Sequence, residues 1–164
     1  MIYAIDASVY IFRAWFSMPD TMVDDDANPV NALYGFTRFI GDFLEGTNPE
    51  LVAVAFDQSL GTCFRNDIYP EYKANRDPAP EELKLQFVRC QQVVGAMGLA
   101  DYSEANFEAD DLIGTVITRM RAKGVSGTIV SRDKDMAQLI SSGDILWDYA
   151  GNRRIGYHDV PDVY

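Results

Sequence analysis

Residues 51–57 read LVAVAFD, and this apolar run that ends at an acid is the clearest structural signal in the chain. Such an unbroken run is typical of a strand buried on both faces of a parallel sheet. Two other stretches have the same form, IYAID at residues 2–6 and TIVSRDKD at residues 128–135. Together they predict buried strands over residues 2–5, 51–56 and 128–130, each followed closely by aspartates.

Helical patterns separate these strands along the chain. In each of them, apolar residues recur at the 3.6-residue spacing of a single helix face. The first opens at Asn28-Pro29, which we interpret as a helix cap and first-turn pair. Strands that alternate with helices predict an α/β fold with a mostly parallel sheet. The expected helices cover residues 28–44, 80–97 and 110–123, and two further strands are expected at residues 145–149 and 154–157.

The length and composition fit one ordinary globular domain. The chain has 164 residues, 48% of them hydrophobic and 24% charged, and no apolar run approaches the roughly 20 residues that span a bilayer. The first residues carry no basic region ahead of their apolar run, unlike a signal peptide. The two cysteines, Cys63 and Cys90, match no disulfide framework and no metal-binding spacing. We therefore expect a single domain over residues 1–164, reduced thiols, a cytoplasmic location and no membrane partner.

The charge balance is acidic. Fourteen lysines and arginines against 25 aspartates and glutamates give a formal net charge of −11. Taken alone, this total argues against a nucleic-acid partner, because binding to phosphates is usually driven by basic surface. The bases gather in two stretches, however, residues 65–76 and 119–134. An acidic protein can still bind an anion if some of its acids first bind cations.

Acidic residues collect where the predicted strands end. The carboxyl ends of parallel strands meet at one edge of a sheet, where open α/β sheets bind their ligands. We therefore expect these aspartates to lie around one crevice, together with the acids that open the third helix. Taken singly, each acid is more simply a turn or helix-cap residue, but their joint placement favours a shared site. The seven candidates are Asp6, Asp57, Glu108, Asp110, Asp111, Asp133 and Asp135.

Carboxylates gathered in this way need counter-charge. Two of them ~4 Å apart repel by about 4 kcal/mol at an effective dielectric constant near 20. Hard divalent cations relieve this repulsion, and ligand sets made only of oxygen favour Mg²⁺, Mn²⁺ or Ca²⁺. Two such ions ~3.5–4 Å apart are the usual apparatus for in-line attack on a phosphodiester. The acid pattern therefore predicts a metal-dependent phosphodiesterase.

The stretch between residues 61 and 80 follows neither periodicity. Structureless loops above ~12–15 residues are usually functional or disordered. Basic and aromatic residues alternate in it, so its bases could hold phosphates while its rings stack on nucleic-acid bases. On spacing alone, a solvated loop is an equally good interpretation. The residues concerned are Arg65, Tyr69, Tyr72, Lys73 and Arg76.

Other chemistries have little support in the sequence. His158 is the only histidine, which disfavours nucleophilic catalysis by a Ser/His or Cys/His pair. The chain contains neither G-x-x-x-x-G-K-[ST] nor G-x-G-x-x-G, so the common nucleotide-binding loops are not indicated.

Five short motifs follow one another along the chain. They read FD at residues 56–57, TCFR at 62–65, YPEYKANR at 69–76, EADD at 108–111 and SRDKDMAQL at 131–139. In this order they closely resemble the bacterial and phage 5′→3′ exonuclease and flap endonuclease family, which includes the 5′-nuclease domain of DNA polymerase I. The resemblance implies a PIN-like (resolvase-like) three-layer α/β fold, in which residues 61–80 form a helical arch or clamp. It also implies cleavage of DNA at free 5′ ends, flaps and nicks by two divalent ions, Mg²⁺ or Mn²⁺, in replication and repair.

The same resemblance implies a role for each candidate residue. Lys73 and Arg76 match the catalytic arch positions that engage the scissile phosphate. Arg65 resembles a further phosphate contact, and Tyr69 and Tyr72 belong to the same DNA-binding stretch. The first metal ion would be held by Asp6, Asp57, Glu108, Asp110 and Asp111, and the second by Asp133 and Asp135.

The resemblance also suggests what the chain lacks. Family members continue into a helical duplex-binding domain that supplies further aspartates to the second metal ion. This chain stops about where that domain begins. We therefore expect weak cleavage by these residues alone, with the second ion loosely held.

Two alternatives stay open at this point. The first is a PIN-like ribonuclease, whose usual size this chain matches. Cleavage of matched DNA and RNA flaps would distinguish it from a 5′→3′ exonuclease or flap endonuclease. A non-catalytic module that holds branched DNA would keep the fold without turnover, which an assay with Mg²⁺ or Mn²⁺ would reveal. The basic residues 69–76 disfavour the first alternative, and the presence of all seven acids disfavours the second.

Overall fold

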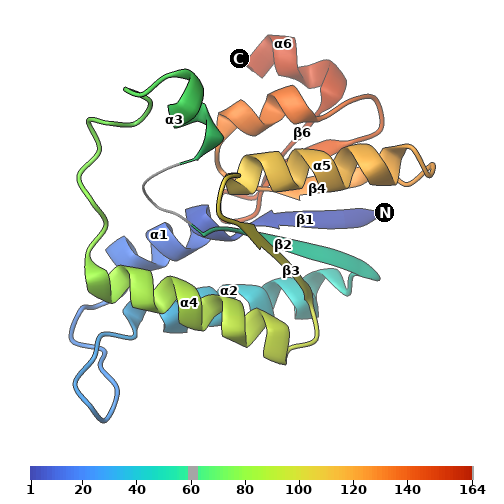
Figure 1. Ribbon diagram of the computed structural model, residues 1–164. Coiled ribbons are helices and arrows are strands. Elements are labelled where there is room, and N and C mark those ends of the chain that lie inside the picture. Colours follow the sequence, from blue (N-terminus) through green and yellow to red (C-terminus); the bar gives the residue numbers. More distant parts are fainter. Residues whose placement is uncertain (59–62, 164) are drawn as a thin grey trace.

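A six-stranded sheet forms the centre of the computed structural model, which describes residues 1–58 and 63–163 (Figure 1). The strands are β1 (Ile2–Asp6), β2 (Leu51–Asp57), β3 (Ala100–Glu104), β4 (Gly127–Val130), β5 (Ile145–Asp148) and β6 (Arg153–Gly156). Their order is β3-β2-β1-β4-β5-β6, and all neighbours are parallel except β6, which runs antiparallel to β5. The three strands that lead into the predicted site acids, β1, β2 and β4, are therefore adjacent.

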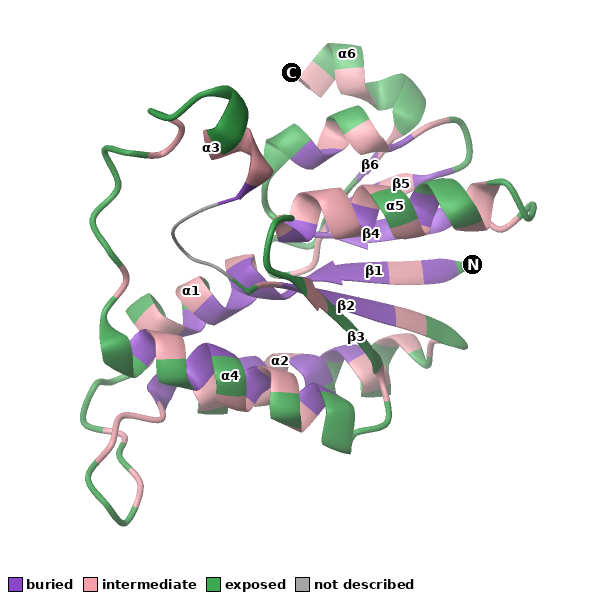
Figure 2. Cartoon of the chain, in the orientation of Figure 1, coloured by how far each residue is buried: buried purple, intermediate pink, exposed green. Residues whose placement is uncertain are grey.

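Helices cover both faces of the sheet and complete a three-layer arrangement (Figures 1 and 2). One apolar cluster packs α1, α2 and α4 against the sheet, and a second packs α5 and the 3₁₀ helix η1 against the opposite face. The predicted α/β class with a mostly parallel sheet is confirmed. The helices are α1 (Ala7–Ser17), α2 (Asn31–Thr47), α3 (Phe64–Ile68), α4 (Glu81–Ala96), α5 (Ala109–Arg121) and α6 (Val160–Val163), with η1 at Lys134–Leu139 and η2 at Tyr157–Asp159.

Strand β3 and helix α1 have no counterpart in the predicted set. Strand β3 lies at the edge of the sheet, and four of its five residues are exposed, so its sequence ADYSE carries no apolar run. Helix α1 begins directly after β1, with Asp6 as its N-cap and no turn between the two elements. The apolar run and the helical pattern therefore merge in the sequence.

The predicted start of the helix over residues 28–44 is wrong. Helix α2 begins at Asn31, and Val30 is its N-cap without a side-chain bond. Asn28 instead belongs to the preceding loop, where its backbone N–H donates to Asp24 Oδ1 at 2.8 Å and its side-chain amide donates at 3.2 Å. Arg89 of α4 also pairs with Asp24, at 3.1 Å. The polar side chain of Asn28 thus stabilises a loop rather than a helix end.

Residues 63–76, which we call the basic segment, lie within the predicted arch of residues 61–80. Helix α3 is the only helix that the described part of this stretch contains, and consecutive turns follow it through Arg76. The segment extends away from the sheet and returns to α4 through an irregular stretch (Figure 1). Residues 61 and 62 lie outside the described residues.

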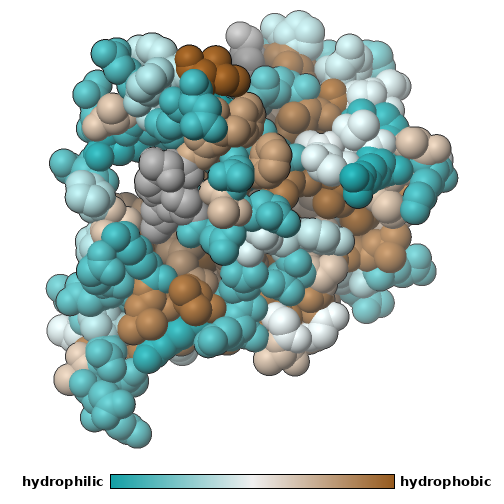
Figure 3. All heavy atoms as spheres, in the orientation of Figure 1, coloured by the Kyte–Doolittle hydropathy of each residue, from teal (hydrophilic) through white to brown (hydrophobic). Residues whose placement is uncertain are grey.

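The surface is mainly hydrophilic on the face shown in Figure 3, with hydrophobic side chains in small groups. One such group lies over α4, where Leu85 and Val88 are exposed. Among the described residues, no helix combines the length and apolar character that crossing a bilayer requires. Cys63 and Cys90 are both buried and free.

Candidate active site

Asp6, at the end of β1, is a buried carboxylate with 4% of its surface exposed. It accepts a long hydrogen bond from Val9 N–H at 3.4 Å, and Ser131 Oγ donates to its other oxygen at 2.9 Å. Burial raises the pKa of Asp6 to about 7; the Ser131 hydrogen bond opposes this shift, whereas the charges of Asp57 and Asp133 add to it. Two of the other predicted acids therefore lie close enough to repel Asp6.

Asp57 ends β2 and connects it to two helices. Its carboxylate accepts a hydrogen bond from Ala109 N–H at the start of α5, at 2.7 Å. Its own N–H donates to Ser8 Oγ of α1 at 3.3 Å. Asp133, beyond β4, is held in a similar way, because its N–H donates to Ser131 Oγ at 3.0 Å. Short polar side chains thus fix the strand ends that carry the acids.

The strand-end carboxylates, as we call Asp6, Asp57 and Asp133, share a lack of basic partners. Within the part of the chain that the structure describes, none of the three forms an ion pair with a lysine or arginine. Asp135 follows them in the sequence but is exposed at the start of η1, where its N–H donates to Asp133 Oδ1 at 2.9 Å. Among the residues that the structure describes, the strand-end carboxylates therefore differ from the candidate acids at the start of α5 in having no ion-pair partner.

The other predicted acids, Glu108, Asp110 and Asp111, lie together where α5 begins, and we call them the helix-start carboxylates. Glu108 is the N-cap, and its N–H donates to the Asp111 carboxylate at 3.0 Å in a capping box. Burial and the charge of Asp111 raise the pKa of Asp110, although Arg65 acts against this shift. The helix dipole favours acids in this turn, but three carboxylates still repel one another.

Arg65 of α3 supplies counter-charge to all three helix-start carboxylates. Its guanidinium binds both oxygens of Asp111, at 2.7 and 2.8 Å, in the bidentate geometry that makes such pairs strong. It also lies 3.1 Å from Glu108 and 3.3 Å from Asp110, and the Tyr72 ring is 5.8 Å away. The hydrogen bond with Asp111 raises the pKa of Arg65 further above its already high value.

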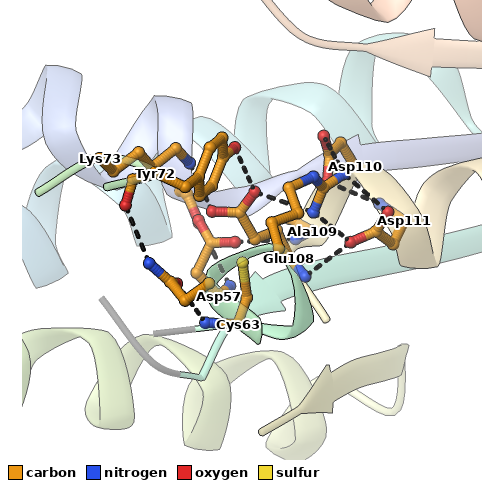
Figure 4. A network of polar contacts seen from close by, with 11 residues as sticks. Asp57, Cys63, Tyr72, Lys73, Glu108, Ala109, Asp110 and Asp111 are labelled. Carbon is orange, nitrogen blue, oxygen red and sulfur yellow. Dashed lines mark hydrogen bonds and ion pairs between the residues drawn. The ribbon is translucent and has the colours of Figure 1, made fainter. Parts of the chain in front are cut away.

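Lys73 is the second base at the start of α5. Its Nζ pairs with Glu108, to which the Tyr72 hydroxyl also donates a hydrogen bond at 3.0 Å (Figure 4). Burial alone would lower the pKa of Lys73, but its contacts with Glu108 and Tyr72 outweigh burial and raise it. The sequence alone predicts that divalent cations offset the repulsion among the acids. At the start of α5, the protein's own bases offset it instead.

A hollow of about 420 Å³ opens beside these groups. Asp57 and Glu108 line it from the sheet side, and Tyr72, Lys73 and Arg76 line it from the basic segment. A second hollow of about 680 Å³ shares Asp57, Lys73 and Arg76 with the first. The helix α1 completes the lining of the first hollow with the aromatic residues Phe12, Trp15 and Phe16.

Two of the predicted DNA-binding residues, Arg76 and Tyr69, form no ion pair or hydrogen bond with the candidate acids among the described residues. Arg76 is exposed at the hollow, and among the described residues no carboxylate lies within ion-pair distance of it. Tyr69 is 55% exposed, and its hydroxyl donates to Glu71 at 3.0 Å outside the carboxylate network. The structure thus brings Arg65, Tyr72, Lys73 and Arg76 to the acids, but not Tyr69.

The donor chemistry of the site fits a hard divalent cation. Every candidate ligand is a carboxylate, and Asp6 is a buried acid with two acidic neighbours. Among residues 1–58 and 63–163, however, no three His, Cys, Asp or Glu side chains are grouped so that they could hold an ion. The strand-end carboxylates have uncompensated charge to offer a cation, whereas the helix-start carboxylates are engaged by Arg65 and Lys73.

Three polar residues of the site were not singled out from the sequence. Ser131 contacts Asp6 and Asp133, and Ser8 contacts Asp57. Asn66 bonds the backbone on either side of α3. The two serines stand within three residues of the end of a predicted buried strand and two residues from an acid, and that position is a usable signal. Asn66 has no comparable signal, because its partners are backbone atoms.

Comparison with known proteins agrees with this geometry. Residues 1–164 match the family model described as the 5′-3′ exonuclease, N-terminal resolvase-like domain. DNA polymerase I of Rhizobium leguminosarum is 37% identical over 169 residues, which cover 99% of this chain and 16% of the polymerase. DNA polymerase I of Chloroflexus aurantiacus is 32% identical over 167 residues, 99% of this chain and 18% of the polymerase. The chain thus spans less than a fifth of these relatives.

Solved structures show the same fold at low sequence identity. A bacteriophage T5 protein crystallised with metal ions aligns with a TM-score of 0.74 at 16% identity, over 98% of this chain and 59% of its own. The catalytic core of Rad2 in complex with a DNA substrate aligns at 0.53 and 17% identity, over 93% of this chain and 46% of its own. The predicted PIN-like fold is confirmed. The chain belongs to the 5′-3′ exonuclease family, and residues 1–164 correspond to the N-terminal resolvase-like domain of that family.

Proposed function

We propose that this chain is the nuclease domain of a metal-dependent 5′→3′ exonuclease or flap endonuclease, which hydrolyses DNA phosphodiesters near free 5′ ends. The observation that carries the proposal is the hollow where Asp57 and Glu108 face Lys73 and Arg76. One strand-end acid, Asp57, and one helix-start acid, Glu108, meet there with bases that could hold a phosphate. A relative by fold, the bacteriophage T5 flap endonuclease, was crystallised with DNA and metal ions, which supports the same substrate class.

The cofactor in this proposal is Mg²⁺ or Mn²⁺. Bound ions would supply a nucleophilic hydroxide and neutralise charge on the phosphate. The strand-end carboxylates and Asp135 would hold ions through oxygens without a basic partner. The helix-start carboxylates would also coordinate a cation if it displaced Arg65 and Lys73 from some of their oxygens. Asp6 is held in place for this task by Ser131.

The basic segment would hold the DNA in this proposal. Lys73 sits at the hollow beside Glu108, so a phosphate bound there would meet a charged ammonium group. Arg76 would bind a neighbouring phosphate, since no carboxylate among the described residues occupies it. Arg65 would add a further phosphate contact. The rings of Tyr69 and Tyr72 would stack on unpaired bases.

Cleavage of a labelled 5′-flap DNA with Mg²⁺, with Mn²⁺ and with EDTA tests the proposal. We expect metal-dependent cutting by the parent chain and its loss in Asp57→Asn. The matched control is Asp42→Asn on α2, which removes an exposed acid whose pair with Arg38 spans 3.9 Å. Cleavage that survives EDTA, or that is equal in Asp57→Asn and the parent, would contradict the proposal.

The same assay separates the two alternatives. Faster cutting of a matched RNA flap than of the DNA flap would identify a PIN-like ribonuclease. Binding of branched DNA without cutting under any metal condition would identify a non-catalytic module. The buried carboxylate of Asp6 disfavours the second alternative, because a module that only binds DNA gains nothing from buried negative charge.

A further inference from the structure

One side chain in the basic segment bonds two separate parts of its backbone. Asn66 Oδ1 accepts a hydrogen bond from Cys63 N–H at 3.0 Å, at the start of α3. Its Nδ2 donates to the carbonyl of Tyr72 at 2.9 Å, on the far side of the turn that follows α3. The Tyr72 carbonyl belongs to the peptide that leads into Lys73. Asn66 therefore closes residues 63–72 into a loop and holds the backbone at the base of Lys73.

Lys73 needs such support for two reasons. Its φ is 57°, in the left-handed region that a residue with a Cβ rarely adopts and that persists only when its surroundings enforce it. Its side chain is long and loses considerable rotamer freedom when it is held against Glu108 at the hollow. The bond from Asn66 constrains the peptide directly before this strained residue.

We propose that Asn66 is a positioning residue that fixes Lys73 at the hollow through the Tyr72 carbonyl. The inference rests on the proposed nuclease function only where turnover is concerned, because the placement of Lys73 can be measured without a substrate. The competing role for Asn66 is that of a capping group for α3 alone. That helix has five residues and buries none of them, so little of the fold depends on its cap.

Two substitutions separate these roles. Asn66→Asp keeps the oxygen that accepts from Cys63 N–H, and aspartate is as good as asparagine in such a bond. It loses the donor to the Tyr72 carbonyl and places a carboxylate against that oxygen. Asn66→Ala loses both bonds. If Asn66 positions Lys73, the two variants behave alike; if it only caps α3, Asn66→Asp behaves like the parent.

The direct measurement is the acetylation rate of the Lys73 amine by limiting acetic anhydride, read by mass spectrometry. Lys123 is exposed and serves as the reference amine in the same molecule. We expect the ratio of Lys73 to Lys123 labelling to rise about fivefold in both variants, which is the population change that one net hydrogen bond supports. Melting curves confirm that each variant is folded. An unchanged ratio in Asn66→Asp would overturn the proposal.

Flap cleavage adds a second, independent result. We expect Asn66→Asp to lower kcat with little change in KM, and Asn66→Asp combined with Lys73→Ala to cut no more slowly than Lys73→Ala alone. A further fall in the double variant would show that Asn66 does not act through Lys73. If Lys73→Ala cuts like the parent, the proposed role of Lys73 fails, while the labelling ratio still decides the role of Asn66.

Discussion

The strand-end carboxylates and the helix-start carboxylates carry the same charge but have different partners. Asp6, Asp57 and Asp133 lie at or just beyond the ends of buried strands and have no ion-pair partner among the described residues. Burial raises the pKa of Asp6, and the charges of Asp57 and Asp133 add to this rise. The helix-start carboxylates are bound by Arg65 and Lys73. An acidic cluster therefore does not by itself require a cation, because a neighbouring segment can supply the counter-charge.

The largest effect is expected at Asp6, in metal-free buffer. Its folded pKa of about 7 lies above the unfolded value of 3.8, so the unfolded chain binds fewer protons between these values and stability falls as the pH rises through them. The substitution Asp6→Asn removes the free-energy cost of burying this charge. We expect Asp6→Asn to exceed the parent in unfolding free energy at pH 8 by up to about 4 kcal/mol, and the gap to close near pH 4.

Chemical denaturation at both pH values measures this gap. Asp42→Asn on α2 is the matched control and should change the unfolding free energy by no more than ~0.5 kcal/mol. A gap of the same size at pH 4 and pH 8 would mean that the substitution acts through packing and that the strand-end carboxylates are not strained by charge.

The second effect concerns turnover at the helix-start side. Lys73→Ala should lower flap cleavage about a hundredfold, the usual loss when one group that stabilises transition-state charge is removed. Lys123→Ala, which removes an exposed lysine, should leave the rate unchanged. Equal rates for Lys73→Ala and the parent would reduce Lys73 to a structural partner of Glu108.

The third effect concerns Arg65→Ala, which would leave the helix-start carboxylates with much less basic counter-charge and so closer to the strand-end carboxylates. Arg65→Ala leaves Glu108, Asp110 and Asp111 without their main base, so the unfolding free energy in EDTA should fall by roughly 2 kcal/mol. Millimolar Mn²⁺ should restore more stability to this variant than to the parent, because a cation can replace the lost charge. Arg38→Ala, which breaks an exposed pair, is the control. A variant that Mn²⁺ does not rescue would contradict this account.

The smallest effect is expected at Tyr72. Tyr72→Phe keeps the ring beside Arg65 and Lys73 but removes the hydroxyl that donates to Glu108. We expect a loss of about 1 kcal/mol in unfolding free energy, the net value of a typical hydrogen bond. Thermal melting of the two proteins measures it, and a loss as large as that of Arg65→Ala would show that the Tyr72 hydroxyl contributes as much to the network as the guanidinium does.

Much of the fold could be predicted because apolar runs and helical periodicity are local signals. LVAVAFD at residues 51–57 and the strands like it are buried on both faces, so their sequences are apolar without interruption. Strand β3 could not be found in this way, because it is exposed at the sheet edge. The Asn28-Pro29 pair misled because a cap residue can also close a loop, as Asn28 does with Asp24.

The acids of the site could be named from the sequence, but their counter-charge could not. The pairing of Arg65 with Asp111 joins residues that lie 46 positions apart, and only the folded chain brings them together. The same holds for Ser131 and Asp6, which are 125 positions apart. Local patterns identify which acids could bind a cation, whereas the tertiary contacts determine which of them already have an ion-pair or hydrogen-bond partner.

Calorimetric titration of Mn²⁺ into the metal-free chain measures whether a divalent ion binds at the strand-end carboxylates and shares the helix-start carboxylates with Arg65. We expect Asp57→Asn to abolish measurable binding, Asp42→Asn to leave it intact, and Arg65→Ala to tighten it about tenfold by removing a competing charge. Equal affinities for Asp57→Asn and the parent, or weaker binding by Arg65→Ala, would contradict this expectation.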